Sequence, residues 1–223
     1  MIHDVDESLR SLIRLRMESE TAVEIVFDAP TRDWASRRNA PTVDLYLYDI
    51  REDADRRQVG QIERRSDDGR RIAGWGSPPR WFKLSYLLTA WTQRPEDEHR
   101  LLSMLLAAFL AQDGIPVEAL AGSLSGAGSP IAYTVALPPP KDRALSDTWS
   151  ALGGELKPSL DLVVTAPFDL GRFDEAGPPV AEPLHIGLID KTVERGDAAY
   201  DPPRMIRRFD RRGAASTSRP ELP

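Results

Sequence analysis

The chain contains no cysteine among its 223 residues. This absence excludes disulfides, thiolate nucleophiles and cysteine-ligated metal sites, and it fits a protein that stays in a reducing compartment. Histidine is also scarce. The three histidines, His3, His99 and His185, lie far apart in the sequence, and none has the spacing of a His-Glu-x-x-His zinc site. We therefore expect the protein to hold neither a metal nor a cofactor.

The chain also lacks a long apolar run. Its longest apolar stretch, Leu101 to Ala111, is interrupted by Ser103 and is too short to cross a bilayer. The first residues, Met1 to Asp6, contain neither the basic region nor the apolar region of a signal peptide. We therefore expect a soluble protein that is kept in the cytoplasm and has no membrane span.

An excess of positive charge is missing as well. The 29 basic and 35 acidic residues give a net charge of −6, which argues against nucleic acid as a partner. Residues 51–72 hold seven arginines against six acids, so this segment is not a purely basic patch. With turn signals at Gly60 and at Asp68-Gly69, the segment is predicted to be a solvated hairpin or flap of mixed charge.

Catalytic motifs are incomplete wherever they begin to appear. The stretch from Gly122 to Gly126 resembles a nucleophile elbow, but leucine occupies the central position that serine must hold. The glycines at 126 and 128 lack the third glycine of a dinucleotide-binding loop, and a predicted strand follows them. The acid pairs at residues 4 and 6 and at residues 67 and 68 have the chemistry to bind a hard cation, but they are interpreted as caps or turns. We therefore do not predict an enzyme.

Apolar periodicity predicts strands interleaved with a few helices. Three- and four-residue spacing predicts helices over 2–17, from Pro95 to a stop at Gly114, and over 145–152. Alternation predicts strands over 23–27, 43–50, 81–91, 131–137 and 160–164. Residues 43–50 are apolar on both faces, with Ile50 placed beside Tyr46 and Tyr48, so this strand is expected to be central. The pattern predicts an α+β fold in which helices flank a mixed β-sheet.

The composition changes near residue 168, which divides the chain into a predicted domain at 1–168 and a proline-rich, partly disordered arm at 169–223. Apolar residues from 184 to 189 are able to add as a strand to a partner sheet, or to pack on their own domain. Five arginines between residues 204 and 212 suit phosphates, an anionic membrane or an acidic protein surface. Our candidate interface residues are two tryptophans in loop-like surroundings and six arm residues: Trp34, Trp75, Ile186, Leu188, Arg204, Arg207, Arg208 and Phe209.

Several stretches together resemble a known family. They are Phe27–Trp34, Asn39–Glu52, Pro79–Tyr86, Ala90–Leu102 and Trp149–Leu162. In this order they resemble the N-terminal domain of the cap, or tail-terminator, proteins of extracellular contractile injection systems, which are phage-tail-like particles of bacteria. The resemblance covers about residues 1–168.

The resemblance implies a structural subunit without catalytic residues. Such a subunit forms a hexameric ring on the inner tube and the contractile sheath, at the end of the particle distal to the baseplate. A stacked tube otherwise ends in open interfaces that keep recruiting subunits, and a closed ring stops that growth. The alternative is a small α+β enzyme or ligand-binding domain associated with such a system, which requires a concave pocket with convergent polar groups.

Overall fold

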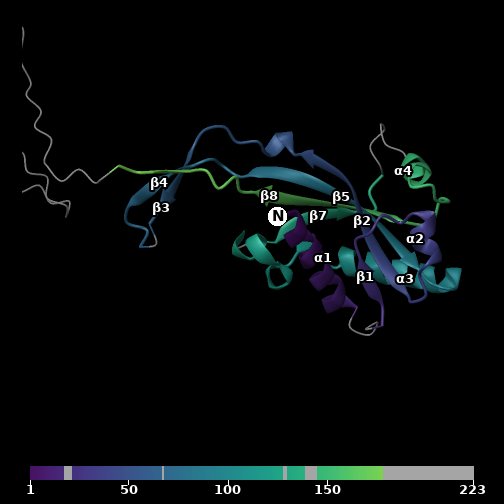
Figure 1. Cartoon of the computed structure of the whole chain (residues 1–223). Coiled ribbons are helices and arrows are strands. Elements are labelled where there is room, and N and C mark those ends of the chain that lie inside the picture. Colours follow the sequence, from purple (N-terminus) through teal and green to yellow (C-terminus); the bar gives the residue numbers. More distant parts are fainter. Residues whose placement is uncertain (18–21, 67, 128–129, 139–144, 178–223) are drawn as a thin grey trace, which may run out of the picture. The chain divides into compact units, whose positions relative to one another are not determined.

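The structure is a computed structural model that describes residues 1–17, 22–66, 68–127, 130–138 and 145–177. Met1 to Glu175 form one compact unit. Over the described residues this unit contains four α-helices and nine strands (Figure 1). The helices are α1 (Ile2–Arg16), α2 (Arg32–Ser36), α3 (Pro95–Leu110) and α4 (Leu145–Ala151).

Six strands form the main sheet in the order β1-β2-β5-β8-β7-β6. Their bounds are β1 Glu24–Val26, β2 Thr42–Glu52, β5 Arg80–Trp91, β6 Gly114–Ile115, β7 Ile131–Val135 and β8 Leu160–Phe168. β1 pairs with β2 in parallel, and the other pairs are antiparallel. The predicted α+β fold with a mixed sheet is confirmed, and β2 is an interior strand as its two apolar faces indicated.

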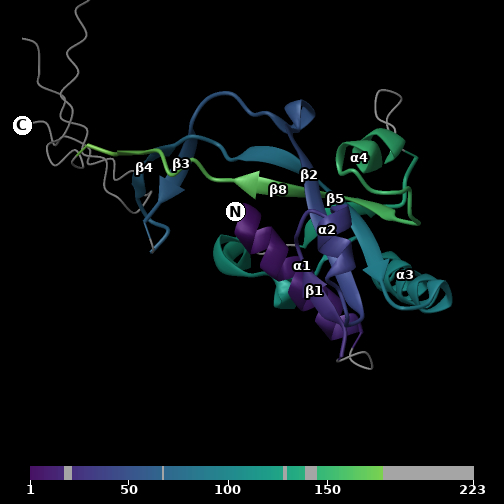
Figure 2. The same ribbon diagram turned by 45° about the vertical axis from the view of Figure 1, so that its right-hand side comes forward.

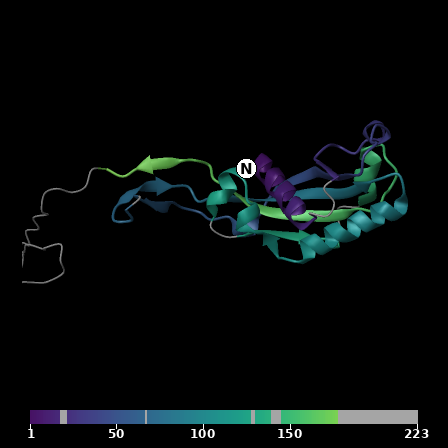
Figure 3. The same cartoon turned by 90° about the horizontal axis from the view of Figure 1, so that it is seen from below.

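One face of the main sheet carries the hydrophobic core. Alternate residues of β5, among them Leu84, Tyr86 and Leu88, are fully buried. They pack in one cluster with the apolar stripe of α1 and with leucines of α3, so both helices cover this face (Figures 1 and 3). Burying one large apolar side chain stabilises the fold by about 1.5–3 kcal/mol, so this two-helix layer is the main source of stability.

α3 begins where the sequence predicts and ends earlier. Pro95 occupies the first turn, followed by three acidic residues that favour the positive end of the helix dipole. The helix ends at Leu110, not at Gly114, which lies in β6 and pairs with Ala132. A Cβ at Gly114 would lie 2.8 Å from the Ile131 carbonyl oxygen, so this glycine serves the close approach of two strands rather than a helix stop.

A β-bulge in β2 corrects one predicted face. The register between β2 and β5 shifts between Leu47 and Asp49, which leaves Tyr48 as an extra residue. Beyond the bulge, Ile50 lies opposite Leu84 on the core face, not beside Tyr46 as alternation predicted. Side chains alternate between the two faces of a strand, so the one extra residue of a bulge moves every later side chain to the opposite face.

A second, three-stranded sheet has the order β3-β4-β9, and we call it the extension sheet. β3 (Ile62–Arg65) and β4 (Ile72–Gly76) form a hairpin (Figure 2). The hairpin or flap predicted over residues 51–72 contains β3 and the turn, whereas β4 lies almost entirely beyond it. β9 (Phe173–Glu175) pairs with β4 and lies beyond residue 168, in a segment for which no strand was predicted. The domain boundary at residue 168 stays a prediction.

Candidate interface surfaces

Trp34, one of the two predicted interface tryptophans, is buried in the isolated chain. Thr31 caps α2 by accepting the backbone N–H of Trp34 at 3.3 Å. The indole Nε1 of Trp34 donates to Asp28 at 2.8 Å, and its ring meets Trp91 edge to face at 5.3 Å. Only 9% of Trp34 is exposed. Its role at a partner interface stays a prediction. Because Trp34 is buried, a partner would contact it only together with the residues that surround it.

Trp34 belongs to a tryptophan cluster, which we define as Trp34, Trp91 and Trp149. The rings of Trp91 and Trp149 lie 6.5 Å apart, and Trp149 is 2% exposed. Two cations cover the cluster: the Arg38 guanidinium lies 4.5 Å from the Trp34 ring, and the Lys157 ammonium lies 4.0 Å from the Trp91 ring. The cluster therefore joins α2, the end of β5 and α4.

Lys157 also ties the cluster to the start of α3. Its ammonium pairs with Glu98, and both side chains are largely buried. The same Glu98 oxygen accepts the backbone N–H of Thr92 at 3.2 Å, just after β5 ends. One carboxylate thus connects the α4–β8 loop, the β5–α3 turn and the first turn of α3, which fixes the orientation of this end of the sheet.

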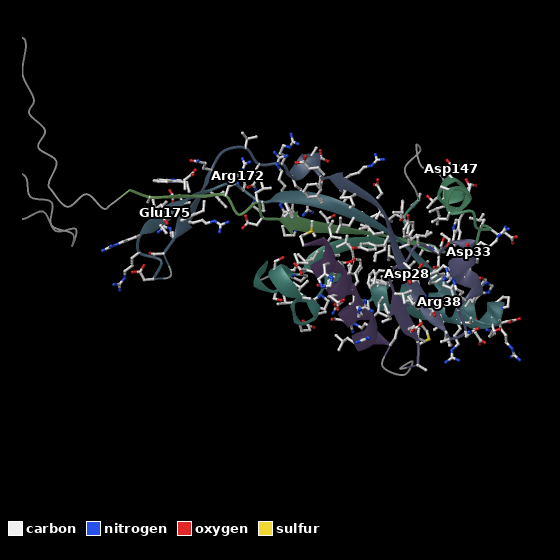
Figure 4. The ribbon with its side chains drawn as sticks, viewed as in Figure 1. Asp28, Asp33, Arg38, Asp147, Arg172 and Glu175 are labelled. Atoms are coloured by element: carbon white, nitrogen blue, oxygen red, sulfur yellow. The ribbon has the colours of Figure 1, made fainter. Side chains whose placement is uncertain are left out.

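A group of polar residues connects β1 and β2 to the segments on either side of α2. The fully buried Asp44 of β2 accepts the backbone N–H of Asp28 at 3.1 Å through Oδ1, while its Oδ2 has no hydrogen-bond partner. Arg38 bridges Glu24 at 3.1 Å and Asp28 at 3.4 Å, and Figure 4 shows Asp28 and Arg38 close together. Burial raises the pKa of Asp44 to about 8, the charge of Asp28 adds to this, and the Asp28 N–H and Arg38 oppose it.

Beside the tryptophan cluster lies a small hollow of about 70 Å³, lined by Ala35, Arg38, Asn39, Ala40, Pro41, Trp91, Thr92 and Gln93. Sites for drug-sized ligands hold about 300–1,000 Å³. The hollow therefore suits a partner's side chain better than a substrate. The described part of the chain contains no group of three or more histidine, aspartate or glutamate residues placed to hold a metal. Its helices are all too short or too polar to cross a membrane.

Trp75, the second predicted tryptophan, lies on the extension sheet and is 38% exposed. Its neighbours in the sheet are Glu63 and Asp174. Three further large apolar residues of this sheet are between 37% and 41% exposed: Ile62, Ile72 and Phe173. Phe173 was not among the candidate residues predicted from the sequence. The two glycines in Gly74-Trp75-Gly76 were an available signal, because a glycine within a strand often marks a place where a neighbouring side chain packs against the backbone.

We expect Gly74→Ala to detach β9 from β4. A Cβ at Gly74 would lie 2.2 Å from the Asp174 carbonyl oxygen and 2.6 Å from the Phe173 ring, closer than real contacts allow. Amide hydrogen exchange of residues 173–175 should accelerate by tenfold or more, while exchange in β5 stays unchanged. Gly126→Ala is the control, because nothing lies within 4 Å of a Cβ there. Unchanged exchange in β9 would show that this pairing does not depend on Gly74.

The other predicted interface residues lie outside the described part of the structure. They are Ile186, Leu188, Arg204, Arg207, Arg208 and Phe209. The predictions for the arm, strand addition by residues 184–189 and anion or acidic-surface binding by residues 204–212, stay predictions.

The family comparison identifies the chain. The model of the Pvc16 N-terminal domain matches residues 4–182. The chain belongs to this family. The matched range includes both sheets, α2, α3, α4 and all but the first two residues of α1, so the family domain contains the extension sheet as well as the main sheet. No curated protein sequence matches the chain.

Solved structures agree on the fold. The chain resembles the sheath/tube terminator of the extracellular contractile injection system PVC in its extended state, with 22% identity and a TM-score of 0.63. It also resembles the tube-terminating cap of the anti-feeding prophage, with 22% identity and a TM-score of 0.57. The matches cover 86% and 83% of this chain, but only 65% and 62% of those proteins, so the chain spans less than two thirds of their length.

Proposed function

We propose that this chain is a structural cap that closes the baseplate-distal end of the tube and sheath of a contractile injection system. The observation that carries the proposal is the shared fold with a sheath/tube terminator, together with membership of the Pvc16 N-terminal domain family. A terminator has to bind one end of a growing stack and present no surface that recruits the next layer.

The proposed working form is a hexameric ring that assembles in the bacterial cytoplasm and contacts both tube and sheath proteins. Ring closure of a head-to-tail interface uses up the reactive surfaces of each copy without unlimited growth. We also propose that the protein acts without catalysis. The small hollow near Trp91 suits an interface contact, and the incomplete nucleophile and dinucleotide motifs favour the same conclusion.

Deletion of the gene from the bacterium that makes the particle tests the function. We expect sheath–tube particles that are scarce, unstable or variable in length by negative-stain electron microscopy. Expression of the intact chain in the deletion strain should restore uniform length. Uniform, fully capped particles from the deletion strain would refute the proposed function.

A further inference from the structure

The two terminal strands of the main sheet, β1 and β6, are poorly suited to strand addition, although each covers only part of its neighbour. β1 forms one edge, and Nη1 of Arg10 in α1 donates to the Ile25 carbonyl oxygen at 2.5 Å. The Arg10 guanidinium also lies 5.0 Å from the Phe27 ring centroid, which holds it there. The other edge, β6, has only two residues, both buried, and Pro116 follows it without an N–H to offer. Covered and very short edges are the usual means by which a sheet avoids pairing with another chain.

The extension sheet has the opposite character. Among the described residues no strand pairs with the outer side of β3 or of β9, so both edges carry unpaired backbone groups. All three residues of β9 are exposed, and so are three of the four residues of β3. A narrow sheet that leaves Ile62, Trp75 and Phe173 this exposed gains little stability from its own burial, and exposed apolar residues of this kind are typical of a surface that binds a partner.

The two open edges carry opposite charge. β3 reads Ile62-Glu63-Arg64-Arg65, and two arginines against one glutamate give a net charge of +1. β9 reads Phe173-Asp174-Glu175, and its two acids give −2. Arg64 pairs with Asp169 at 2.7 Å and is 40% exposed. Arg65 is 61% exposed, pairs with Glu63 at 3.7 Å and donates to the Gly69 carbonyl oxygen at 3.4 Å. Both arginines of the β3 edge are therefore exposed enough to meet another chain.

We propose that the β3 edge of one copy pairs with the β9 edge of the next copy, which joins their extension sheets into one continuous sheet. This inference rests on the proposed ring and names the surface that builds it. The partner is a second copy of this chain because the same sheet presents both complementary edges. Since the two edges are different surfaces, the contact is head-to-tail, the kind that closes into a ring.

The register within one copy shows which side chains the contact brings together. Ile62, Gly76 and Phe173 form one row across the sheet, and Arg64, Gly74 and Glu175 form another. β3 and β9 both run antiparallel to β4, so they run parallel to each other. Continuing the rows into the next copy places an apolar pair, Ile62 with Phe173, and an opposite-charge pair, Arg64 with Glu175, on one face. On the other face, the row of Glu63, Trp75 and Asp174 places Glu63 opposite Asp174 of the next copy. Arg65, two residues further along β3, then lies diagonal to Asp174 and offsets this like-charge pair.

Disulfide trapping tests the contact, because the cysteine-free chain forms no background bridge. The variant is Glu63→Cys with Asp174→Cys in the full chain. Within one copy β4 separates these strands, so the two positions are about 10 Å apart. A disulfide needs Cβ atoms about 3.5–4.5 Å apart, so a bridge forms only between copies. We expect a ladder of covalent oligomers on a non-reducing gel after mild oxidation.

A matched control is Glu63→Cys with Asp147→Cys, since Asp147 is exposed on α4, away from either extension edge. It should yield far less of the ladder. Absence of the ladder from a chain that is oligomeric in solution, or a chain that stays monomeric throughout, would overturn the edge pairing. Irregular particles in the deletion strain would still support the cap, so the two proposals fail separately.

Charge reversal supplies a second test. Arg64→Glu alone and Glu175→Arg alone each place like charges in the row that these two residues share, and we expect each to weaken association by about fivefold per contact. A one-to-one mixture of the two variants should recover the oligomer measured by native mass spectrometry. When the two variants alternate, the reversed β3 residue of one variant meets the reversed β9 residue of the other, and the two unchanged residues meet at the next contact. Each contact then again pairs opposite charges. A mixture that associates no better than its components would refute the pairing.

Discussion

Replacing Asp44 with asparagine is expected to weaken the pH dependence of this protein's stability between pH 5 and 8. In the wild-type chain the folded state keeps a proton on Asp44, because burial raises its pKa to about 8. In the unfolded chain the same group ionises near 4. Between these values the folded state binds more protons than the unfolded state, so the free energy of unfolding falls as the pH rises.

The stability that this proton contributes is complete below about pH 4 and is lost as the pH rises through about 8. The slope is at most about 1.4 kcal/mol per pH unit. Thermal or urea unfolding of wild type and of Asp44→Asn at pH 5, 6, 7 and 8 measures the effect. Asparagine keeps the shape of the side chain and cannot ionise, so the stability of this variant should fall less steeply with pH over this range than that of the wild type.

Asp33→Asn is the matched control, because Asp33 lies exposed in the first turn of α2. It also removes one acid, so it reports the effect of net charge alone. A wild-type protein whose stability is constant or rises from pH 5 to 8 would contradict the burial of a protonated Asp44.

Ionisation of Asp44 should affect the structure locally. Asp44 accepts the backbone N–H of Asp28, and this hydrogen bond helps to hold the segment that leads into α2.

Replacing Trp91 with alanine is expected to destabilise the chain by about 3 kcal/mol. The Trp91 ring contacts the rings of Trp34 and Trp149 and the Lys157 ammonium. Its removal therefore opens a cavity and deprives these three side chains of a packing partner. Urea unfolding followed by circular dichroism measures the loss, and near-ultraviolet signals should show looser packing of the remaining tryptophans.

Trp75→Ala provides the comparison for a tryptophan of the extension sheet. Because Trp75 is 38% exposed, its removal should cost the isolated chain about 1 kcal/mol or less. If Trp91→Ala were as mild as Trp75→Ala, the tryptophan cluster would not hold α2 and α4 on the sheet. The two variants together separate tryptophans that stabilise the subunit from those that face a partner.

The sequence alone determined the elements whose stability is local. The apolar stripe of α1, the long alternation of β5 and the proline followed by acids at the start of α3 each predict their element, and the structure confirms all three. The same holds for the α+β fold, and the predicted mixed-charge segment contains the first strand and the turn of the β3–β4 hairpin. Periodicity and capping act between residues that are close in the chain, so the sequence displays them directly.

Only the tertiary structure decided the features that depend on distant partners. Trp34, in loop-like sequence surroundings, is buried because Trp91 and Asp28 meet its ring and its indole nitrogen. Ile50 lies on the same side of the sheet as Leu84 because a bulge shifts its register, although 47% of Ile50 is exposed. Three-residue β9 exists as a strand because β4 offers it a free edge. Strand pairing joins residues about 100 positions apart, so no local pattern reports it. The opposite charges of β3 and β9 were visible in the sequence, but only the sheet that places them on opposite edges makes them complementary.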